Sequence, residues 1–561
     1  MNRREFVCGL SAVLPLSRYA WGEGHELHCE IAVIGGGTGG FAAALAALRN
    51  GRRVILTEET DWLGGQLTSQ AVPPDEHFWI EKFGSTASYR LYRNEVREYY
   101  RKNFPLTATA RSNPYLNPGN GSVSRLTHEF GVSAAVLKAK LHPYIVSGKL
   151  SVLYHHVPES ATTHGDYVDS VTLRDLHTGD RKIVHARYFL DATELGDLLA
   201  MAGAESVTGT ESRNSTQEMS APEVGEPRNS QGIAYCFAMD YLEGEEHLIE
   251  KPANYAYWKN YKPELRPAWT GPLLSWTSCT PTTLHPQTAQ MAPNGKIARG
   301  FSDLWSFRRI ADRGNFVSGA YRSDITLVNW PQNDFWLEDM VTATPDERRQ
   351  IIARARELSL SLFYWMQTEA PRPDGGVGFR GLRLRPDITG TPDGLAKTVY
   401  VRESRRIQAE FTILQQHVDA EIRRTLFKDS DLGRRAEVYP DSVGVGCYRI
   451  DLHPSVGGTN YVDRSCLPFQ IPLGALLPIR IQNLIPACKN IGATHISNGC
   501  TRLHPVEWNI GEAAGALASF AFARQRLPRE VRHKQILLQD FQRSLVVQGF
   551  ELAWPKDVHA I

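Results

Sequence analysis

The first regular pattern of apolar and polar positions lies near the N-terminal side of the chain. Residues 31–34 form a short apolar run, as expected of a buried strand, and residues 41–49 are rich in Ala and Leu, as expected of a helix. A second apolar run at residues 54–57 predicts another strand. Strand, helix and strand follow one another within about 30 residues, which is typical of a βαβ unit.

Later segments extend this mixture of helices and strands. Residues 89–104 and 132–145 have the pattern of helices, the first of them exposed, and residues 149–157 predict a strand. Residues 167–193 alternate on both sides of a turn at residues 177–180, which predicts two antiparallel strands. We therefore expect an α/β fold.

The pattern changes in the middle of the chain, where Pro, Trp, Tyr and polar loops replace regular periodicity. Such irregular, aromatic-rich sequence suggests a domain whose loops shape a binding cavity. A chain of 561 residues is also too long for one simple core. The expected parts are a first domain at 28–205 with an insertion at 75–125, a substrate or cap domain at 206–465, a returning segment at 466–527, and a C-terminal helix and tail at 528–561.

Composition and charge exclude broad classes of function. The chain is 42% hydrophobic and 22% charged, and 62 basic against 61 acidic residues leave a formal net charge of +1. This balance gives no general attraction to nucleic acid or to an anionic membrane. No apolar run in the sequence reaches the length that spans a bilayer. Function must therefore come from a specific site.

Residues 1–24 have the features of a signal peptide. Arg3 and Arg4 precede a mildly apolar run from Val7 to Leu16, and paired arginines are typical of the twin-arginine route. We therefore expect a periplasmic or secreted protein; the alternative is a frayed cytosolic arm with a chance pair of arginines. The cysteines include no CxxC pair, so no metal site is expected.

A glycine motif follows the first predicted strand. Gly35, Gly37 and Gly40 form G-x-G-x-x-G at the start of the helix. In a dinucleotide-binding unit the first glycine allows a tight turn, the second lets the backbone approach a pyrophosphate, and the third lets helix and strand pack closely. Glu58 ends the second strand, where a carboxylate can accept both ribose hydroxyls. This combination predicts dinucleotide binding.

Two further segments favour FAD over NAD. The doublet Gly64-Gly65 follows Glu58 closely and lets the chain pass beside a diphosphate and a flavin. A later strand ends at Asp191 and is followed by a Gly-Asp pair and a helix, which is more typical of flavoproteins than of NAD dehydrogenases. The predicted cofactor-binding residues of these segments are Gly35, Gly37, Thr38, Gly39, Gly40, Glu58, Gly64, Gly65, Gln66, Leu67, Asp191, Ala192, Thr193, Gly196 and Asp197.

The glycine motif and the segments around Gly64 and Asp191 are joined by three later segments, "YVRESRRI", "DLHPSVGG" and "NLIPACKNIGATHISNGCTRLHPVEWNIGEAAGALA". Together they span residues 31–518. The chain thereby resembles FAD-dependent oxidoreductases with a two-domain, glutathione-reductase-like FAD fold, and within them the secreted bacterial members often labelled xanthan lyase-like. The resemblance implies FAD as cofactor and a discontinuous Rossmann-like FAD-binding domain with an inserted α+β substrate or cap domain. Gly492, which Ala493 follows, stands where many relatives carry Gly-Asp for the ribityl chain.

The resemblance also gives a role to the helix expected from Pro505. In such flavoproteins the last helix of the nucleotide domain aims its N-terminus at the pyrimidine end of the isoalloxazine, where its dipole stabilises negative charge on the reduced flavin. The backbone of Asn509 and Ile510 is then expected near the ring. Gly511 and Gly515 are expected to let this helix lie close to a flat neighbour.

Several polar residues are candidates for catalysis, because flavin dehydrogenation needs a base or polar clamp beside flavin N5. His504 and Glu507 lie at the start of the last helix, although Glu507 is equally well explained as a first-turn acid favoured by the dipole. His453, with Asp451 as a partner, is an alternative base. Arg405 is suited to clamp a carboxylate or a flavin carbonyl, or to form ion pairs.

The expected function is an FAD-dependent oxidoreductase, a dehydrogenase or an oxidase, that transfers hydride from a polar organic substrate to flavin N5. Its expected partners are this small molecule and an electron acceptor, either oxygen or a carrier, since no second G-x-G-x-x-G exists for NAD(P)H. Two alternatives stay open. One is a flavin-dependent reductase of an activated double bond; the other is a carbohydrate lyase or binding protein whose flavin has no redox role.

Overall fold

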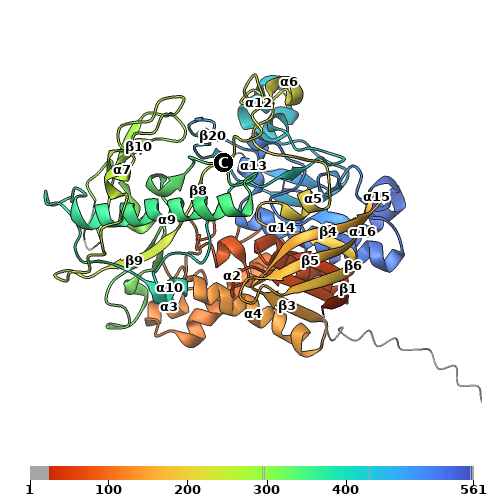
Figure 1. Cartoon of the computed structure of the whole chain (residues 1–561), viewed down its shortest axis with the longest axis horizontal. Coiled ribbons are helices and arrows are strands. Elements are labelled where there is room, and N and C mark those ends of the chain that lie inside the picture. The colour runs from red at the N-terminus through yellow and green to blue at the C-terminus, as the bar shows by residue number, and fades with distance from the viewer. Residues whose placement is uncertain (1–24, 294, 296, 429, 556–557, 559–561) are drawn as a thin grey trace, which may run out of the picture.

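The structure is a computed structural model that describes residues 25–293, 295, 297–428, 430–555 and 558. The expected signal peptide at residues 1–24 lies outside the described residues, so export stays a prediction. Figure 1 shows a large sheet on one side of the molecule and a loop-rich region, crossed by the long helix α9 (Pro345–Thr368), on the other. None of the described helices is both long and apolar enough to cross a bilayer.

The large sheet confirms the expected α/β fold. It has seven strands in the order β3-β2-β1-β6-β5-β4, with β22 also paired to β6. Strands β1, β2 and β3 pair in parallel, and β6 is parallel to both β1 and β22. Strand β5 is antiparallel to β4 and to the first half of β6, as the alternation of residues 167–193 predicted. The strands are β1 (Glu26–Ile34), β2 (Val54–Glu58), β3 (Leu150–Tyr154), β4 (His156–His164), β5 (Tyr167–Asp175), β6 (Arg181–Asp191) and β22 (Leu484–Pro486).

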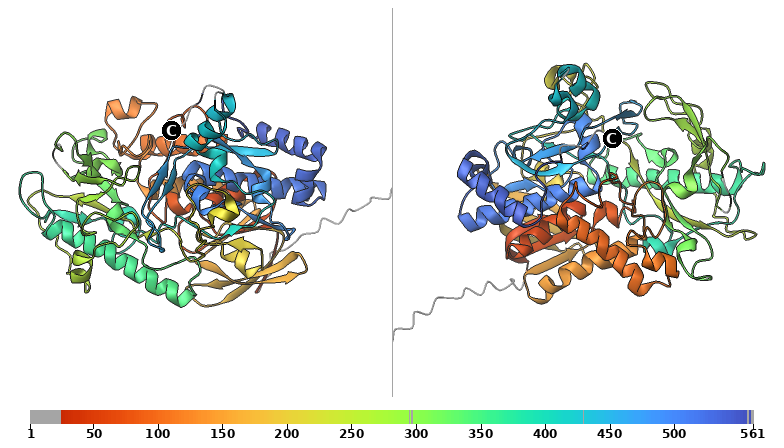
Figure 2. Two further views of the ribbon diagram at one scale, coloured as in Figure 1. Left: turned by 90° about the horizontal axis from the view of Figure 1, so that it is seen from above. Right: turned by 180° about the vertical axis from the view of Figure 1, so that it is seen from behind.

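Two distant parts of the chain meet in this sheet. The end of β6 pairs with β1 on one side and with β22 on the other, where Leu484 lies opposite Phe189. Figure 2 shows from two further sides that the first segments of the chain, in red, and its last helices, in blue, lie together. The segment after residue 466 therefore returns to the strands that began the fold.

Helix α1 (Thr38–Arg49) and helix α14 (His504–Arg524) cross with their backbones in contact. A Cβ added to Gly511 would lie 1.9 Å from the carbonyl oxygen of Gly39, and one added to Gly515 would lie 2.1 Å from that of Ala43. The flat neighbour expected for these glycines is therefore the backbone of α1. A ring is not needed to explain them, because only glycine fits a crossing this close.

Helix α2 (Ala87–Asn103) was expected to be exposed, and this prediction is wrong for one of its faces. Tyr89, Tyr92 and Tyr100 are fully buried at helical spacing. Arg93 and Arg97 are buried as well, paired with acidic side chains from residues 76 and 81. The polar composition misled because these arginines are neutralised inside the protein.

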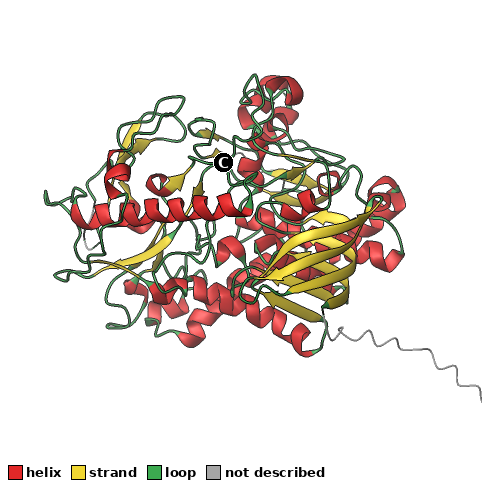
Figure 3. Cartoon of the chain, in the orientation of Figure 1, coloured by secondary structure: helices red, strands yellow, loops and turns green. Residues whose placement is uncertain are grey.

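Apart from the 24-residue helix α9, the region between residues 206 and 465 is built from short elements, as its irregular sequence suggested. Its main sheet has the order β13-β14-β9-β16, and the long helix α9 is the most extended helix in Figure 3. A capping box between Thr344 and Glu347 and a proline at the first position start that helix.

The bounds of the remaining elements up to residue 260 are α3 (Ala108–Ser112), α4 (Phe130–Val146), α5 (Asp197–Met201), β7 (Ser206–Val207), α6 (Arg213–Thr216), β8 (Ile233–Ala234), β9 (Phe237–Tyr241) and α7 (Tyr255–Asn260), with the short 3-10 helix η1 (Gly65–Leu67). Those up to residue 407 are β10 (Thr277–Cys279), β11 (Pro286–Gln290), β12 (Ser302–Asp303), α8 (Leu304–Phe307), β13 (Arg309–Ala311), η2 (Arg313–Asn315), β14 (Ile325–Val328), η3 (Pro331–Asn333), β15 (Asp334–Phe335), β16 (Leu382–Leu384), α10 (Pro386–Thr389) and β17 (Arg406–Ile407). The last are α11 (Gln415–Val418), α12 (Ala420–Leu426), η4 (Asp431–Arg434), β18 (Ser442–Gly446), β19 (Ile450–Leu452), β20 (Val462–Arg464), β21 (Phe469–Pro472), η5 (Leu473–Leu476) and α13 (His495–Thr501).

After residue 527 the chain forms two helices, where the sequence predicted one helix and a tail. Helices α15 (Pro528–His533) and α16 (Gln535–Val547) are separated at Lys534, whose φ of −101° and ψ of 106° are extended. One extended residue breaks the helical hydrogen bonding, and a periodic sequence does not reveal such a break.

Candidate functional site

Two glycine segments meet at the carboxyl end of the sheet. The Gly64 N–H donates to the Gly36 carbonyl at 2.8 Å, and the Thr38 hydroxyl donates to the Gly64 carbonyl at 2.8 Å. A Cβ added to Gly65 would lie 2.8 Å from the Cα of Gly37. We call residues 35–40 together with Gly64-Gly65 the glycine cradle. Both segments predicted to bind the cofactor are therefore brought together.

The segment that begins at Asp191, which was also predicted to bind the cofactor, forms one wall of the cradle. Gly35 has a φ of +105°, and a Cβ there would lie 2.2 Å from the Ala192 carbonyl oxygen. The buried Asp191 carboxylate accepts hydrogen bonds from the Thr193 N–H at 2.9 Å and the Leu199 N–H at 3.0 Å, and burial raises the pKa of Asp191 to about 6. Its side chain therefore shapes the turn that leads through Gly196 into α5.

Glu58 lies beside the cradle at the end of β2. Its Oε1 accepts from the N–H and the hydroxyl of Thr60 at 2.8 and 2.7 Å, while a Cβ added to Gly36 would lie 2.7 Å from its Oε2. Burial, with a contribution from neighbouring Glu59, raises the pKa of Glu58 to about 8. A cavity of about 500 Å³ opens next to this strand end, between Trp62, Tyr154 and the N-terminal half of α4.

Three charged side chains lie at the mouth of the cradle, and we call Glu194, Lys489 and Glu507 the cradle ion cluster. Lys489 forms an ion pair with Glu194, and its Nζ lies 3.8 Å from Glu507 Oε2. Glu507 accepts from the Gly39 N–H at 3.1 Å and from Gln66 Nε2 at 2.6 Å. Burial raises the pKa of Glu507 more than the charge of Lys489 lowers it. Glu507 thus ties α14 to α1.

A second polar group is centred on His453, which follows β19. Its Nδ1 lies 2.6 Å from Asp334 Oδ2, and its Nε2 lies 3.6 Å from Asp451 Oδ2. The imidazole is 21% exposed, whereas Asp334 is buried and its other oxygen accepts from Arg402 at 2.8 Å. We call His453, Asp334, Asp451, Arg402 and Arg502 the His453 cluster.

Arg502 connects the His453 cluster to the glycine cradle. Its guanidinium donates to the Asp451 carboxylate at 3.2 Å and to the Tyr400 hydroxyl at 2.8 Å. Its backbone carbonyl accepts from Gln66 Nε2 at 3.1 Å. Burial alone would raise the pKa of Asp451, but the interactions with His453 and Arg502 outweigh it and lower that pKa overall. Asp451 is therefore a stable carboxylate beside His453.

His504 has a different environment from His453. It is fully buried, and its Nδ1 accepts from the Asp75 N–H at 3.0 Å. Burial lowers the pKa of His504 to about 3. A neutral imidazole whose Nδ1 accepts a hydrogen bond carries its proton on Nε2. His504 is therefore arranged to donate a hydrogen bond, and the geometry favours His453 as the base.

The comparisons decide the family. The chain matches the family of FAD dependent oxidoreductases over residues 30–545. It belongs to this family. Its cofactor is therefore FAD, and it is an oxidoreductase. A search of the curated proteins found no significant match.

Similarity of this flavoprotein to solved structures is low. A geranylgeranyl bacteriochlorophyll reductase-like protein (Ta0516) from Thermoplasma acidophilum is 10% identical with a TM-score of 0.34, and the match covers 94% of this chain and 85% of that chain. The myxobacterial chondrochloren halogenase CndH is 15% identical with a TM-score of 0.25, over 40% of this chain and 46% of that chain. This chain therefore spans less than half of the halogenase, and no activity is transferred from either protein.

Buried polar atoms around the cradle fit a bound FAD. Among the described residues, no hydrogen-bond partner is found for Gln66 Oε1, for either amide atom of Gln70, for Arg502 Nε or for His504 Nε2. Buried polar atoms are normally satisfied, so a group of them beside a glycine-lined opening indicates a polar ligand. The pteridine edge and the ribityl and diphosphate groups of FAD offer such partners.

Arg405, the predicted clamp, is engaged at the start of α5. Its guanidinium lies 3.0 Å from Asp197 Oδ1 and 3.1 Å from the Leu195 carbonyl oxygen. Arg348 also pairs with Asp197, at 2.8 Å. Arg405 and Asp197, both predicted as site residues, therefore satisfy each other, which agrees with the ion-pair alternative.

The remaining predicted residues lie in the protein interior. The Asn509 amide packs on β18, where Nδ2 donates to the Val443 carbonyl at 3.4 Å, and Ile510 and Leu67 are buried. A Cβ added to Gly492 would lie 2.3 Å from the Phe411 carbonyl oxygen, so close packing explains this glycine. Contacts of these residues with FAD stay predictions.

Sequence reasoning missed Asp334, Glu194 and Lys489. Asp334 lies 119 residues before His453, and no motif links them. Glu194 lies inside the recognised segment "DATELGD", but a lone acid there carries no signal of its own. Lys489 is only 2% exposed, and burial of a lysine is not readable from sequence.

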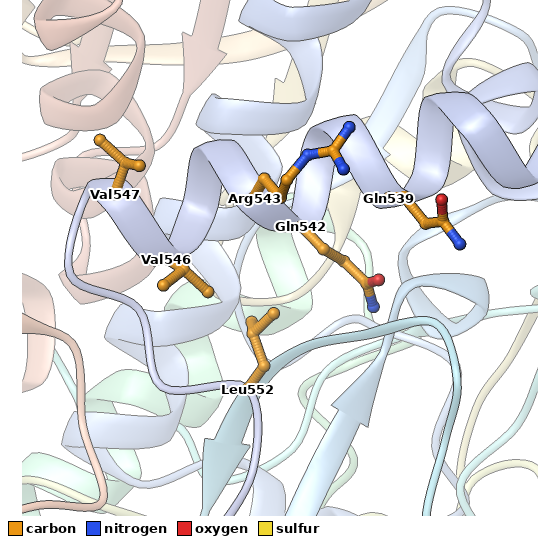
Figure 4. Close-up of a pocket in the computed structure, with 6 residues that line it drawn as sticks. All are labelled: Gln539, Gln542, Arg543, Val546, Val547 and Leu552. Carbon is orange, nitrogen blue, oxygen red and sulfur yellow. The ribbon is translucent and has the colours of Figure 1, made fainter.

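The surface depression on α16 carries no chemistry of this kind. A depression of about 470 Å³ on α16, shown in Figure 4, is lined by Gln539, Gln542, Arg543, Val546, Val547 and Leu552. It contains no carboxylate, histidine or thiol. Within the described part of the chain, no group of three or more His, Cys, Asp or Glu side chains is arranged to hold a metal ion.

Proposed function

We propose that the chain oxidises a polar organic substrate, as an FAD-dependent dehydrogenase or oxidase, with His453 as the group that takes up the substrate proton. The observation that carries this proposal is the His453 cluster, in which a partly exposed imidazole is fixed by a buried carboxylate. When bound, FAD supplies the hydride-accepting chemistry.

The contacts of His453 suit a general base. Because Asp334 accepts from Nδ1, the neutral imidazole carries its proton there and leaves the Nε2 lone pair free. Asp334 is held by Arg402, so the ring has a fixed orientation. Asp451 lies 3.6 Å from Nε2 and stabilises the positive charge that the ring acquires when it takes up a proton.

A polar substrate is supported by groups that surround His453. The Tyr461 ring lies 5.5 Å from the His453 ring, and the Gln231 side-chain carbonyl accepts from the backbone N–H of His453 at 3.3 Å. Neither the Tyr461 hydroxyl nor Gln231 Nε2 has a hydrogen-bond partner among the described residues. Hydroxyl or carbonyl groups of a substrate would satisfy them.

The reductase alternative is less well supported, because it needs an arginine free to hold a carboxylate. Arg402 pairs with Asp334, Arg405 with Asp197, and Arg406 with Glu403. Each of these guanidiniums is therefore already paired with a carboxylate of the chain.

A relationship to the secreted, xanthan lyase-like members and export by the twin-arginine route are further parts of this proposal. They rest on the sequence of residues 1–24 and on the quoted segments. Expression of the full chain, and of a variant with both Arg3 and Arg4 replaced by Lys, tests export. The proposal expects the mature protein outside the cytoplasm only for the unchanged chain.

Anaerobic mixing of the FAD-loaded protein with panels of sugars, polyols, hydroxy acids and amines tests the reaction. The proposal expects at least one donor to bleach the absorbance of oxidised flavin. The reductase alternative is favoured instead if activated alkenes reoxidise the chemically reduced protein and no donor reduces the oxidised protein. A flavin that reacts with neither class would favour the lyase or binding alternative.

A further inference from the structure

The cradle ion cluster holds more negative than positive charge. Lys489 is buried between two carboxylates, those of Glu194 and Glu507. With both acids ionised, the three side chains carry a net charge of −1. Such a cluster next to a diphosphate site needs an explanation, because an incoming diphosphate brings further negative charge.

The two carboxylates occupy space that the cradle glycines leave open. A Cβ added to Gly37 would lie 2.7 Å from Glu194 Oε1 and 4.0 Å from Glu507 Oε1, and one added to Gly65 would lie 3.0 Å from Glu194 Oε1. Gly37 is the glycine of the motif that lets the backbone approach a pyrophosphate. Glu194 therefore lies where the diphosphate of the cofactor comes closest to the backbone.

The two acids differ in how firmly they are held. Glu507 is 1% exposed and is fixed by the Gly39 N–H and by Gln66 Nε2 in addition to Lys489. Glu194 is 21% exposed and pairs with Lys489. Glu194 therefore has a path to solvent, whereas movement of Glu507 would break the contact between α14 and α1.

We propose that Lys489 binds the cofactor diphosphate, and that Glu194 holds its ammonium group until the dinucleotide arrives. On binding, Lys489 exchanges the Glu194 carboxylate for a phosphate oxygen, and Glu194 turns towards solvent. Glu507 keeps its contacts and holds Lys489 in place. Glu194 thus competes with the diphosphate, and the exchange favours ligands with a diphosphate over flavins without one.

Titration calorimetry of the cofactor-free protein with FAD and with riboflavin tests this exchange, because riboflavin has the same ring and no phosphate. Lys489→Met is expected to weaken FAD binding by at least tenfold and to change riboflavin binding less than twofold. Glu194→Gln is expected to strengthen FAD binding several-fold and to leave riboflavin binding unchanged. Lys140→Met and Glu95→Gln, which alter an ion pair between α4 and α2, are the matched controls and should change neither.

The single variant Lys489→Met leaves two carboxylates without their lysine and could therefore misfold. The double variant Glu194→Gln/Lys489→Met keeps the net charge of the cluster and measures the effect of the lysine without this problem. It is expected to bind FAD at least tenfold more weakly than Glu194→Gln alone. The proposal is overturned if the lysine substitution leaves FAD affinity within twofold in both backgrounds, if it weakens FAD and riboflavin equally, or if Glu194→Gln weakens FAD binding. No substrate is used, so these results are independent of the proposed reaction.

Discussion

The glycine cradle and the His453 cluster, which Arg502 connects, are built in different ways. The cradle is made of backbone from short sequence motifs, and its key contacts join residues 36, 38 and 64. The His453 cluster is made of side chains from residues 334, 402, 451, 453 and 502, which only the folded chain brings together. The comparison teaches that the glycine cradle is encoded locally, whereas the His453 cluster, the proposed site of proton transfer, depends on the whole fold.

The largest effect is expected at the crossing of α1 and α14, where the two backbones leave no room for a side chain. Gly511→Val places a branched side chain on a position whose Cβ alone would lie 1.9 Å from the Gly39 carbonyl oxygen. The crossing of α1 and α14 must then open, at a cost of about 3 kcal/mol. We expect little folded protein and no bound FAD, as measured by thermal unfolding and flavin content.

Gly295→Ala is the control for this prediction, because among the described residues its Cβ would meet only the Ala292 Cβ, at 3.9 Å. It should unfold at the wild-type temperature and bind FAD normally. A Gly511→Val protein with normal stability and flavin content would show that the close crossing is not required.

The next largest effect separates the two histidines. His453→Gln should slow flavin reduction by the donor about 10²- to 10⁴-fold, the range for loss of a general base, and leave FAD affinity within about twofold. Asp334→Asn should slow the same step by a smaller factor, because the imidazole loses its orienting carboxylate. Stopped-flow reduction measures both rates.

His504→Gln is the control for His453→Gln. Since Nδ1 of His504 already accepts from the Asp75 N–H inside the protein, its loss should affect stability more than the rate of proton transfer. Equal losses of rate in the two histidine variants would remove the distinction between a reactive and a structural histidine.

A smaller effect is expected at Glu58, where one substitution should weaken FAD binding and yet stabilise the cofactor-free protein. Glu58→Gln should weaken FAD binding roughly tenfold, because one of the two carboxyl oxygens that can accept from the ribose hydroxyls is replaced by an amide nitrogen. Burial raises the pKa of Glu58 from 4.5 to about 8, so between these values the folded chain holds a proton that the unfolded chain releases. Stability of the cofactor-free protein therefore falls as pH rises through this window.

Thermal unfolding of the cofactor-free Glu58→Gln protein at pH 5 and pH 8 checks the sign. The variant should gain stability relative to the wild type at pH 8 and gain little at pH 5. A gain that is the same at both pH values would mean that Glu58 does not titrate differently in the folded chain.

The smallest effect is expected at Arg405. Arg405→Gln should change flavin reduction and FAD affinity by less than about threefold, since Asp197 keeps its pair with Arg348. A loss of a hundredfold in rate would restore the clamp role that the sequence suggested.

Much of the cradle could be predicted, because its glycine spacing, strand ends and helix starts are each determined by a few neighbouring residues. The same reasoning placed His504 and Glu507 correctly at the start of a helix but not their side chains, which face Asp75 and Gly39 inside the protein. For His453 it proposed Asp451, which lies 3.6 Å away, and missed the closer Asp334. Side-chain direction and long-range pairing are set by tertiary packing, which one sequence does not display.

The most direct test of the central claim is the FAD content of the purified protein and of Gly37→Val, read from flavin absorbance after denaturation. The Gly37 Cβ position lies 2.7 Å from Glu194 Oε1, so a valine side chain would fill the opening of the cradle. The account predicts one FAD per chain in the wild type, as purified or after reconstitution, and none in the folded variant. A wild-type protein that binds no FAD, or a Gly37→Val protein that binds one per chain, would contradict it.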